Sequence, residues 1–378
     1  MNAGLLGRTL GHSLSPLIHR FFADGSYRLF AREPEAVEDF VRHAFEVERL
    51  DFLNVTVPYK RTVFAICDEL TDLARRLGNV NLVRRSPSGA LVGDNTDAFG
   101  FARLLDSAAA DVRGRNAAVL GAGGAALTAK AVLEDRGARR VTLVRRGEEP
   151  AADDEIVVNA TPVGMWPASD AARIDISRFP ACRTVLDLVY NPSPTRLVRE
   201  ARACGKCAAD GLVMLVAQAF AAHAEAAPGT LFLYGPPASG KSTWARVVAA
   251  ATGWACIDLD AEIVRRAGRA IPDVFAAEGE QGFRKLERAA LEEICAAAAP
   301  SGRVVALGGG ALLDPACRRL AESAGRIVVL EADAATLKSR LTGADRPLSA
   351  DPAALDALLA SRAAHYASFA RPQIFQNY

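Results

Sequence analysis

An excess of charge of one sign is missing from this sequence. Its 45 lysine and arginine residues face 44 aspartate and glutamate residues, which leaves a formal net charge of +1. Proteins that bind nucleic acid or an anionic membrane through their overall field carry a clear basic surplus, so the sequence predicts neither partner. Runs of about 18 apolar residues are missing too, which argues against a transmembrane helix.

Signals for export are equally scarce. Residues 1–13 contain no basic region followed by an apolar core, so we expect no signal peptide. The seven cysteines are odd in number and scattered, and they make no disulfide framework. Cys204 and Cys207 have CxxC spacing, but zinc would need a second pair or nearby histidines, so we expect a structural or incidental role. These features favour a reducing, cytoplasmic location. Nothing in the sequence indicates the oligomeric state.

What the sequence has in quantity is short apolar runs that alternate with helical patterns. Examples are NAAVLG at 116–121, RVTLV at 140–144, EIVVN at 155–159, TLFLYG at 230–235 and RIVVLEA at 326–332. This alternation predicts an α/β fold with parallel sheets and right-handed crossovers. A chain of 378 residues is too long for one ordinary core. The clearest seam is AAPG at 226–229, so we predict one domain over 1–226 and another over 230–378.

A first glycine turn follows the run at 116–120. Gly121, Gly123 and Ala126 fit the pattern G-x-G-x-x-G/A, in which backbone N–H groups and a helix N-terminus approach a pyrophosphate. The next strand ends at Arg145 and Arg146, where NAD-binding sheets place a carboxylate for the ribose. Two cations there suit a 2′-phosphate and favour NADP over NAD. The alternative is a solvated basic loop.

Upstream of this turn, polar segments predict a site for a small hydroxylated acid. LGHSLSPLIH, NVTVPYK, LGNVNLV and GDNTDAFGF are dense in small hydroxyl and amide side chains. Each hydroxyl of a bound ligand needs paired donors and acceptors of this kind. Lys60 follows Pro58, a signal for the start of a helix. Its ammonium would lie near the positive end of that helix, which eases loss of a proton near neutral pH.

These segments, together with NATPVGM, DLVYNPSPTRLVREA and ADGLVMLVAQAF, resemble shikimate dehydrogenase over residues 3–226. The resemblance implies a substrate part at 1–102 with 210–226, and an NADP-binding Rossmann part at 103–209. It implies reduction of 3-dehydroshikimate to shikimate with NADPH, with Lys60 and Asp97 as the catalytic pair. A simple ion pair is the alternative for these two residues.

The resemblance also implies two sets of binding residues. The substrate contacts would be Ser13, Ser15, Thr56, Asn81, Asp97, Tyr190 and Gln218. The NADP contacts would be Gly121, Ala122, Gly123, Gly124, Ala125, Arg145, Arg146 and Gly211.

Some features depart from the family pattern. Leu82 replaces the usual threonine, and the usual Asn-Arg-Thr at the 2′-phosphate is Val144-Arg145-Arg146. Only residues 147–156 separate Arg146 from the next strand, whereas a parallel crossover usually takes about a dozen residues or more, with a helix. We therefore expect an abridged NADP domain and weaker contacts on the adenosine side.

A second glycine loop, GPPASGKS at 235–242, meets the pattern G-x-x-x-x-G-K-[ST] in full. Its backbone N–H groups would surround phosphates, Lys241 would reach the β and γ groups, and Ser242 would coordinate Mg²⁺. Asp258 and Asp260 come at the end of the next strand, where a spacing of two points both side chains the same way. A helix cap is the other interpretation of these aspartates.

Further motifs predict an anionic phosphoryl acceptor. Arg284, Arg362 and the glycines 308–310 would converge on one pocket, since guanidinium groups pair well with carboxylates. For Arg362 alone, a surface charge is the alternative. DRPLS, after a helix that holds Arg340, is typical of a mobile lid, with Arg346 facing the transferred phosphate.

These motifs resemble shikimate kinase over residues 230 to about 372. The resemblance implies a P-loop domain related to nucleoside monophosphate kinases, which phosphorylates shikimate on its 3-hydroxyl with ATP. The ATP contacts would be Gly235, Ser239, Gly240, Lys241, Ser242, Thr243, Arg340 and Arg346. Shikimate would contact Asp260, Arg284, Gly308, Gly309, Gly310 and Arg362, and Mg²⁺ would bind Ser242 and Asp258. Lys241 and Asp260 would be catalytic.

Two departures concern ATP. The lid has serine where the family prefers a second leucine, and ARPQIFQNY at 370–378 leaves room for a last strand but no closing helix. We expect weaker ATP binding.

The two resemblances together imply a bifunctional enzyme of aromatic amino-acid biosynthesis that uses NADPH, ATP and Mg²⁺ in consecutive steps. One alternative is an active kinase with a degenerate, non-catalytic dehydrogenase-like module. Another is a dehydrogenase that acts on quinate with NAD, against which Arg145 and Arg146 argue.

Overall fold

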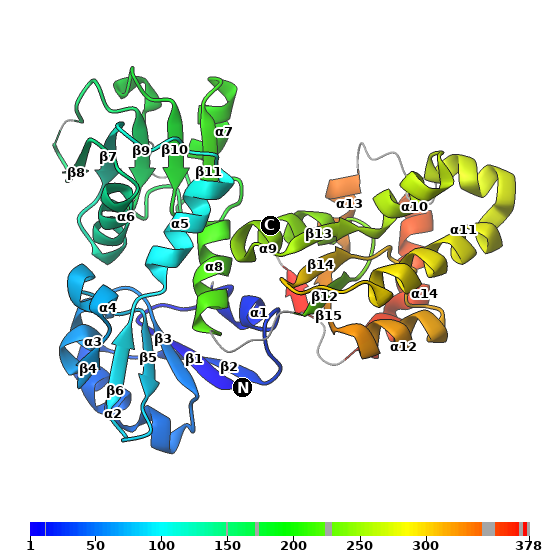
Figure 1. Ribbon diagram of the computed structural model, residues 1–378, viewed down its shortest axis with the longest axis horizontal. Coiled ribbons are helices and arrows are strands. Elements are labelled where there is room, and N and C mark those ends of the chain that lie inside the picture. Colours follow the sequence, from blue (N-terminus) through cyan, green and yellow to red (C-terminus); the bar gives the residue numbers. More distant parts are fainter. Residues whose placement is uncertain are drawn as a thin grey trace. The chain divides into compact units, whose positions relative to one another are not determined.

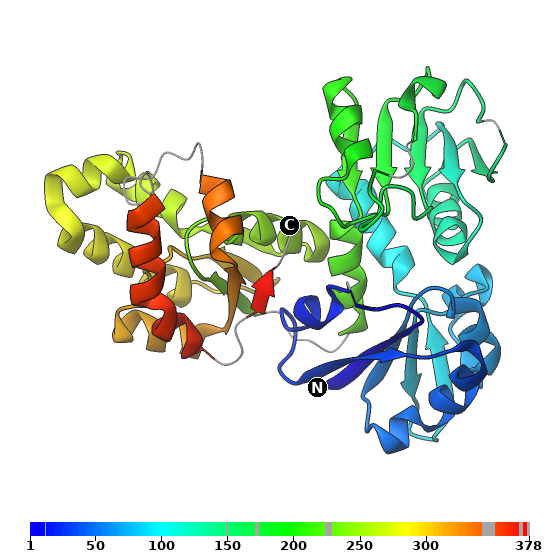
Figure 2. The same ribbon diagram turned by 180° about the vertical axis from the view of Figure 1, so that it is seen from behind.

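The structure is a computed structural model, and it describes residues 1–11, 13–148, 150–170, 174–223, 229–341, 352–369 and 373–375. The chain divides into two compact units (Figures 1 and 2). The first contains residues 1–226 with 250–252, and the second contains residues 227–249 with 253–378. Among the described residues, no helix is long and apolar enough to cross a membrane.

The first unit begins with a six-stranded sheet of order β2-β1-β3-β5-β6-β4. Its strands are β1 (Asn2–Gly7), β2 (Ser26–Ala31), β3 (Phe52–Val55), β4 (Glu69–Leu70), β5 (Leu82–Arg85) and β6 (Leu91–Asp94). Its helices are α1 (Ser15–His19), η1 (Pro34–Ala36), α2 (Val37–Val47), α3 (Lys60–Ile66) and α4 (Asp72–Leu77). Buried apolar residues from α2, α3 and the strands form one core.

The expectation of parallel sheets is wrong for part of this sheet. Strand β5 runs antiparallel to both β3 and β6. The reason is local, because β5 and β6 are joined by a short turn in which Ser86 N donates to Ala90 O. Gly89 in that turn has φ +92°, a conformation that glycine adopts readily. A connection this short can only reverse the chain.

A second sheet, of order β11-β10-β9-β7-β8, is parallel throughout. Its strands are β7 (Asn116–Leu120), β8 (Arg140–Val144), β9 (Ile156–Asn159), β10 (Thr184–Asp187) and β11 (Cys207–Asp210). Its helical elements are α6 (Gly124–Asp135), η2 (Ile176–Arg178) and α7 (Arg196–Ala203). Helices α5 (Asp97–Ser107) and α8 (Leu212–Ala222) pack together and run between the two sheets (Figure 1).

The expected abridgement of the NADP domain is confirmed. The described residues between β8 and β9 form turns and no helix. Charged groups hold this connection instead: Arg140 Nη2 lies 2.5 Å from Asp153 Oδ1 and 3.0 Å from the buried Asp154. Asn116 Nδ2 donates to Asp153 Oδ2 at 2.7 Å. Hydrogen bonds and ion pairs therefore hold the connection between β8 and β9 in place of a packed helix.

The second unit is a parallel five-stranded sheet of order β13-β14-β12-β15-β16. Its strands are β12 (Thr230–Tyr234), β13 (Ala255–Asp258), β14 (Arg303–Ala306), β15 (Arg326–Ala332) and β16 (Gln373–Phe375). Its helices are α9 (Lys241–Thr252), α10 (Leu259–Ala267), α11 (Ile271–Ala296), α12 (Pro315–Ala324), α13 (Ala334–Leu341) and α14 (Pro352–Ala367). Helix α14, red in Figure 2, contributes Tyr366 to the core that contains Tyr234 of the central strand β12.

Candidate functional sites

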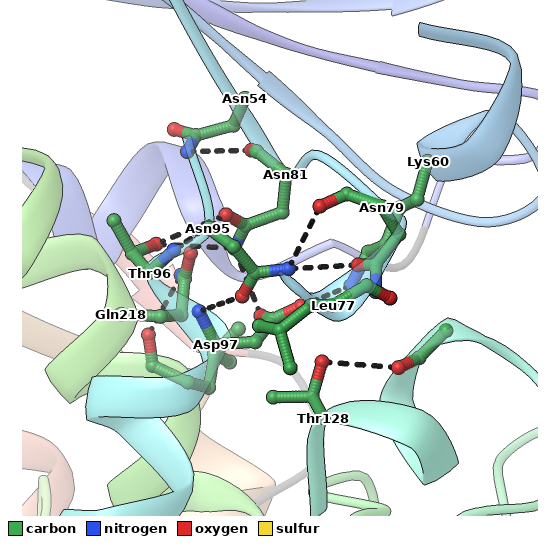
Figure 3. A network of polar contacts seen from close by, with 12 residues as sticks. Asn54, Lys60, Leu77, Asn79, Asn81, Asn95, Thr96, Asp97, Thr128 and Gln218 are labelled. Atoms are coloured by element: carbon green, nitrogen blue, oxygen red, sulfur yellow. Dashed lines mark hydrogen bonds and ion pairs between the residues drawn. The ribbon is translucent and has the colours of Figure 1, made fainter. Parts of the chain in front are cut away.

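The first candidate site centres on a buried ion pair. Lys60 is the first residue of α3 and Asp97 the first residue of α5. Lys60 Nζ lies 2.5 Å from Asp97 Oδ2, and the two side chains are 15% and 7% exposed (Figure 3). A lysine held in this way, with little water around it, is suited to give a proton to a neighbouring oxygen.

A network rich in asparagine holds Asp97 through the atoms that do not contact Lys60 (Figure 3). Asn81 Nδ2 donates to Asp97 Oδ1 at 2.9 Å and to Thr96 Oγ1 at 3.0 Å. Asn95 Oδ1 accepts from Asp97 N at 3.0 Å, while its Nδ2 donates to Asn79 Oδ1 at 2.7 Å. All of these side chains are buried, so the carboxylate has one well-defined position. Sequence reasoning missed Asn79, Asn95 and Thr96, although their density in LGNVNLV and GDNTDAFGF was the available signal.

The first glycine turn lies beside this pair. Gly121 has φ +113°, and Gly123 is the N-cap of α6. A Cβ on Gly124 would lie 3.4 Å from Asn79 Oδ1 and 3.7 Å from Lys60 Cδ. Within the described part of the chain, and apart from Gly123 and the residue on either side of it, no atom lies within 4 Å of a Cβ on Gly123. The free amides at the start of α6 and the open space at Gly123 therefore fit the pyrophosphate of a dinucleotide next to Lys60.

The predicted 2′-phosphate contacts are exposed. Arg145 and Arg146 follow β8 directly, and both are exposed. A carboxylate that the sequence analysis did not consider lies with them, because Arg145 N donates to Glu148 Oε2 at 2.7 Å. The cations fit a phosphate at this position, whereas Glu148 opposes one.

Four of the remaining predicted residues lie on or next to α1, β3 and α8. Ser15 begins α1, is buried, and donates its N–H to Ser13 Oγ at 3.2 Å. Thr56 directly follows β3. Gln218 of α8 packs against Gly100 of α5, one turn beyond Asp97.

Two further predicted residues lie near the carboxyl end of β10. Burial raises the pKa of Tyr190, so its hydroxyl stays protonated. A Cβ on Gly211 would lie 2.3 Å from Leu188 O. Glycine at 211 therefore has a packing reason as well as the predicted cofactor contact.

The second candidate site is the loop between β12 and α9. Gly235 has φ +136°, and a Cβ there would lie 2.1 Å from Leu330 O. Lys241 is buried, and its Nζ donates to the carbonyls of Gly235 at 2.9 Å and Pro236 at 2.7 Å. Ser239 is buried within the loop. The Lys241 ammonium therefore binds carbonyl groups of its own loop, at the position where phosphates would bind.

Other ATP-side predictions surround this loop. Gly240 is the N-cap of α9 with φ +90°, and Thr243 is exposed in the first turn of that helix. Arg340 of α13 lies on the loop, with Nη1 3.4 Å from Ala238 O. Arg346 lies outside the described residues.

The predicted magnesium pair is in contact. Ser242 Oγ donates to Asp258 Oδ2 at 2.6 Å, while Asp258 Oδ1 accepts from Asp260 N at 3.0 Å as the N-cap of α10. An oxygen pair at the end of a phosphate-binding loop suits Mg²⁺. The expectation that Asp258 and Asp260 share one strand face is wrong, because β13 ends at Asp258 and Asp260 lies in the first turn of α10.

The three glycines after β14 are closely surrounded. A Cβ on Gly308 would lie 2.8 Å from Glu287 Oε1 and 3.3 Å from Asp260 Oδ1. A Cβ on Gly310 would lie 2.6 Å from Arg284 Nη2, and Gly309 O accepts from Arg362 Nη1 at 3.2 Å. The structure thus brings Asp260, Arg284 and Arg362 around one glycine turn.

Sequence reasoning missed Glu287, the buried carboxylate of this cluster. Its Oε2 lies 2.6 Å from Arg284 Nη1, and its Oε1 has no hydrogen-bond partner among the described residues. Burial raises the pKa of Glu287 even though Arg284 opposes that shift. The i, i+3 spacing from Arg284 was the available signal, but such pairs also occur on exposed helix faces.

The geometry defines two catalytic classes in one chain, a dinucleotide-dependent reductase with a lysine–carboxylate pair and a P-loop phosphotransferase. Comparisons with known proteins agree with both. Residues 5–83 match the family model of the shikimate dehydrogenase substrate binding domain, and residues 237–377 match that of shikimate kinase.

Relatives cover the first unit nearly whole. A shikimate dehydrogenase (NADP⁺) of Symbiobacterium thermophilum is 35% identical over 251 residues, which cover 57% of this chain and 85% of the relative. One from Methylobacterium radiotolerans is 38% identical over 249 residues, with coverage of 57% and 88%. The solved shikimate dehydrogenase 1 of Peptoclostridium difficile has a TM-score of 0.54 at 32% identity, covering 59% of this chain and 90% of that one.

A Thermus thermophilus enzyme, solved with NADP(H) and shikimate, has a TM-score of 0.52 at 31% identity, covering 58% of this chain and 91% of that one.

The protein described here belongs to the shikimate dehydrogenase family, and its C-terminal part carries a shikimate kinase domain. It is a bifunctional enzyme that uses NADP(H), ATP and Mg²⁺.

Proposed function

We propose that the first unit reduces 3-dehydroshikimate to shikimate and that the second phosphorylates the 3-hydroxyl of this product. The observation that carries the first half is the buried Lys60–Asp97 pair beside the glycine turn. The second half rests on the Ser242–Asp258 contact and the cations around the glycines at 308–310. The reactions are consecutive, which gives the fusion a chemical reason.

In the first unit, Lys60 and Asp97 act together. NADPH supplies the hydride when it is bound. Lys60 gives its proton to the ketone oxygen as that oxygen gains negative charge, and Asp97 keeps the ammonium directed at it. General acid catalysis of this kind contributes about 10²–10⁴ in rate. Contacts to the substrate are assigned to Ser13, Ser15, Thr56, Asn81, Tyr190 and Gln218.

In the second unit, Asp260 orients the attacking hydroxyl, and the lysine and arginine side chains bind the negative charges of the two substrates. ATP with Mg²⁺ supplies the phosphoryl group when it is bound. Lys241 would exchange its own loop carbonyls for the phosphates, and Ser242 with Asp258 would hold the metal. Arg284 and Arg362 bind the acceptor carboxylate, beside the glycines at 308–310.

The first test measures NADPH oxidation by the purified chain after addition of 3-dehydroshikimate, with ATP absent. We expect turnover that disappears in Lys60→Ala and persists in Lys241→Ala. Phosphorylation of added shikimate should show the reverse pattern, so each variant is the folding control of the other. A parent chain that phosphorylates shikimate but does not oxidise NADPH would contradict the dehydrogenase role and favour a ligand-binding module. Comparison of rates with quinate and NAD⁺ decides the remaining substrate question.

A further inference from the structure

One carbonyl group in the second unit receives more hydrogen-bond donors than it has lone pairs. Gly309 O accepts from Tyr366 Oη at 2.7 Å, from Arg362 Nη1 at 3.2 Å and from Tyr234 Oη at 3.3 Å. A carbonyl oxygen has two lone pairs. One of the three donors can therefore leave, and the carbonyl oxygen still has a donor for each of its two lone pairs.

The two tyrosines are fixed in place. Tyr234 is fully buried in the central strand β12, and Tyr366 is 4% exposed. The centroids of their rings lie 5.4 Å apart, and the ring centroid of Phe369 lies 5.3 Å from that of Tyr234. Burial raises the pKa of Tyr234, so its hydroxyl keeps the proton that it donates.

His365 completes the arrangement. Its Nε2 lies 3.1 Å from Tyr234 Oη. A tyrosine hydroxyl has one hydrogen, so if Tyr234 donates to Gly309 O, His365 Nε2 carries the hydrogen between the two rings. In that tautomer the Tyr234 hydroxyl accepts from His365 and keeps its own hydrogen for the carbonyl.

Arg362 is the donor that is free to move. Its side chain is only half-buried, and its guanidinium has further N–H groups beyond the one on Gly309. An anionic acceptor is a stronger partner for it than a neutral carbonyl is. The charge of Arg362 also acts on the buried Glu287, where it opposes the rise in pKa that burial causes.

We propose that Tyr234 is a positioning residue of the kinase: together with Tyr366 it satisfies the Gly309 carbonyl, and so releases Arg362 to bind the carboxylate of the acceptor. The inference rests on the proposed kinase function, because that function supplies the carboxylate. Without Tyr234, Arg362 and Tyr366 would be the two donors to the carbonyl among the described residues. Acceptor binding would then have to break a bond that nothing replaces.

The test compares steady-state phosphorylation of shikimate, without NADP⁺, in four variants. Tyr234→Phe keeps the buried ring and removes only the hydroxyl. We expect it to raise KM for shikimate about three- to tenfold, while kcat and KM for ATP change by less than about twofold. Arg318→Met is the matched control, because Arg318 also packs on this aromatic cluster, at Phe369, while its hydrogen bonds within the described residues go to Glu322 and Ser368 and none to Gly309 O. It should leave KM for shikimate within about twofold.

A double-mutant cycle tells whether Tyr234 acts by releasing Arg362 from the Gly309 carbonyl or only by supporting the glycine turn. Arg362→Met removes the competing donor, so adding Tyr234→Phe to it should change KM for shikimate by less than about twofold. Equal effects of Tyr234→Phe with and without Arg362 would overturn the proposal. So would an unchanged KM in Tyr234→Phe, or a parallel rise in KM for ATP. A parent chain with no ATP-dependent turnover is a different result, since it would remove the kinase function and the inference with it.

Discussion

The two sites of this chain differ in how far their charged groups are already in working contact. In the first unit, Lys60 lies on Asp97, and asparagines fix that carboxylate. In the second unit, Lys241 and Arg362 instead donate to backbone carbonyls of the loops that they serve. The predicted charged groups of the first unit are therefore already in contact with each other, whereas those of the second unit would have to exchange internal hydrogen bonds for bonds to ligands.

This difference follows from the charges that each site handles. A reductase needs one proton at one oxygen, and a fixed donor is the efficient arrangement. A kinase gathers several cations around phosphates and a carboxylate, and those cations would repel one another without temporary acceptors. Carbonyl groups of the glycine-rich turns are such acceptors. The predictions below test this contrast.

The largest effect is expected from Asp97→Asn. The amide keeps the size of the side chain but loses the charge that holds Lys60, so dehydrogenase kcat should fall by about 10²-fold or more, with a small change in KM. NADPH oxidation measures this, and Asp106→Asn on the exposed part of the same helix is the control. A fall in kinase activity as well would show general unfolding instead. A loss of less than about fivefold would mean that Lys60 does not depend on Asp97.

The next effect is a pH dependence of stability in the first unit. Burial raises the pKa of Asp187 to about 6, against a few hydrogen bonds such as that from Asn159. The fold therefore prefers the neutral carboxyl, and the associated stability, about 3 kcal/mol, is fully present below about pH 4 and is lost as the pH rises through about 6. The free energy of unfolding should fall over this window in the parent and much less in Asp187→Asn. Calorimetry with and without NADPH identifies the transition of this unit, and equal pH slopes in both proteins would contradict the assignment.

Glycine substitutions test the contrast at the two turns. Gly310→Ala places a Cβ 2.6 Å from Arg284 Nη2, whose guanidinium is tied to Glu287. We expect KM for shikimate to rise about tenfold in the kinase reaction. The added Cβ of Gly123→Ala meets no atom of the described residues within 4 Å apart from those of its chain neighbours, so it should change Tm little and mainly raise KM for NADPH. Kinetics and thermal unfolding of both variants check this, and a large loss of Tm in Gly123→Ala would count against an open cradle.

The fold could be predicted where the pattern is local. Strand, glycine turn and helix follow one another directly at Gly121 and at Gly235, and the strands at 116–120, 140–144 and 326–332 lie where the apolar runs predict them. The direction of β5 could not be read from its own residues, because it is set by the turn after it. Asp260 was misplaced for a similar reason: a strand and a helix cap share the same short polar pattern at that point.

The sites could be predicted only in part. The sequence singled out Lys60, Asp97 and the cations of the kinase by residue type, and their roles stay predictions. It did not reveal Glu287 or Tyr234, because a glutamate on a long helix and a tyrosine in an apolar strand are ordinary core or surface residues until their neighbours are known. Contacts between distant segments decide both cases.

The smallest predicted effect concerns Glu148, whose carboxylate binds the backbone N–H of Arg145. A negative charge there opposes a 2′-phosphate, so Glu148→Gln should lower KM for NADPH about twofold at low salt and less at high salt. NADH lacks that phosphate and is the internal control: its KM should not improve. The measurement is the ratio of the two KM values at two ionic strengths. An unchanged ratio would place the 2′-phosphate away from Arg145, and the exposed arginines would then be the solvated basic loop that the sequence left open.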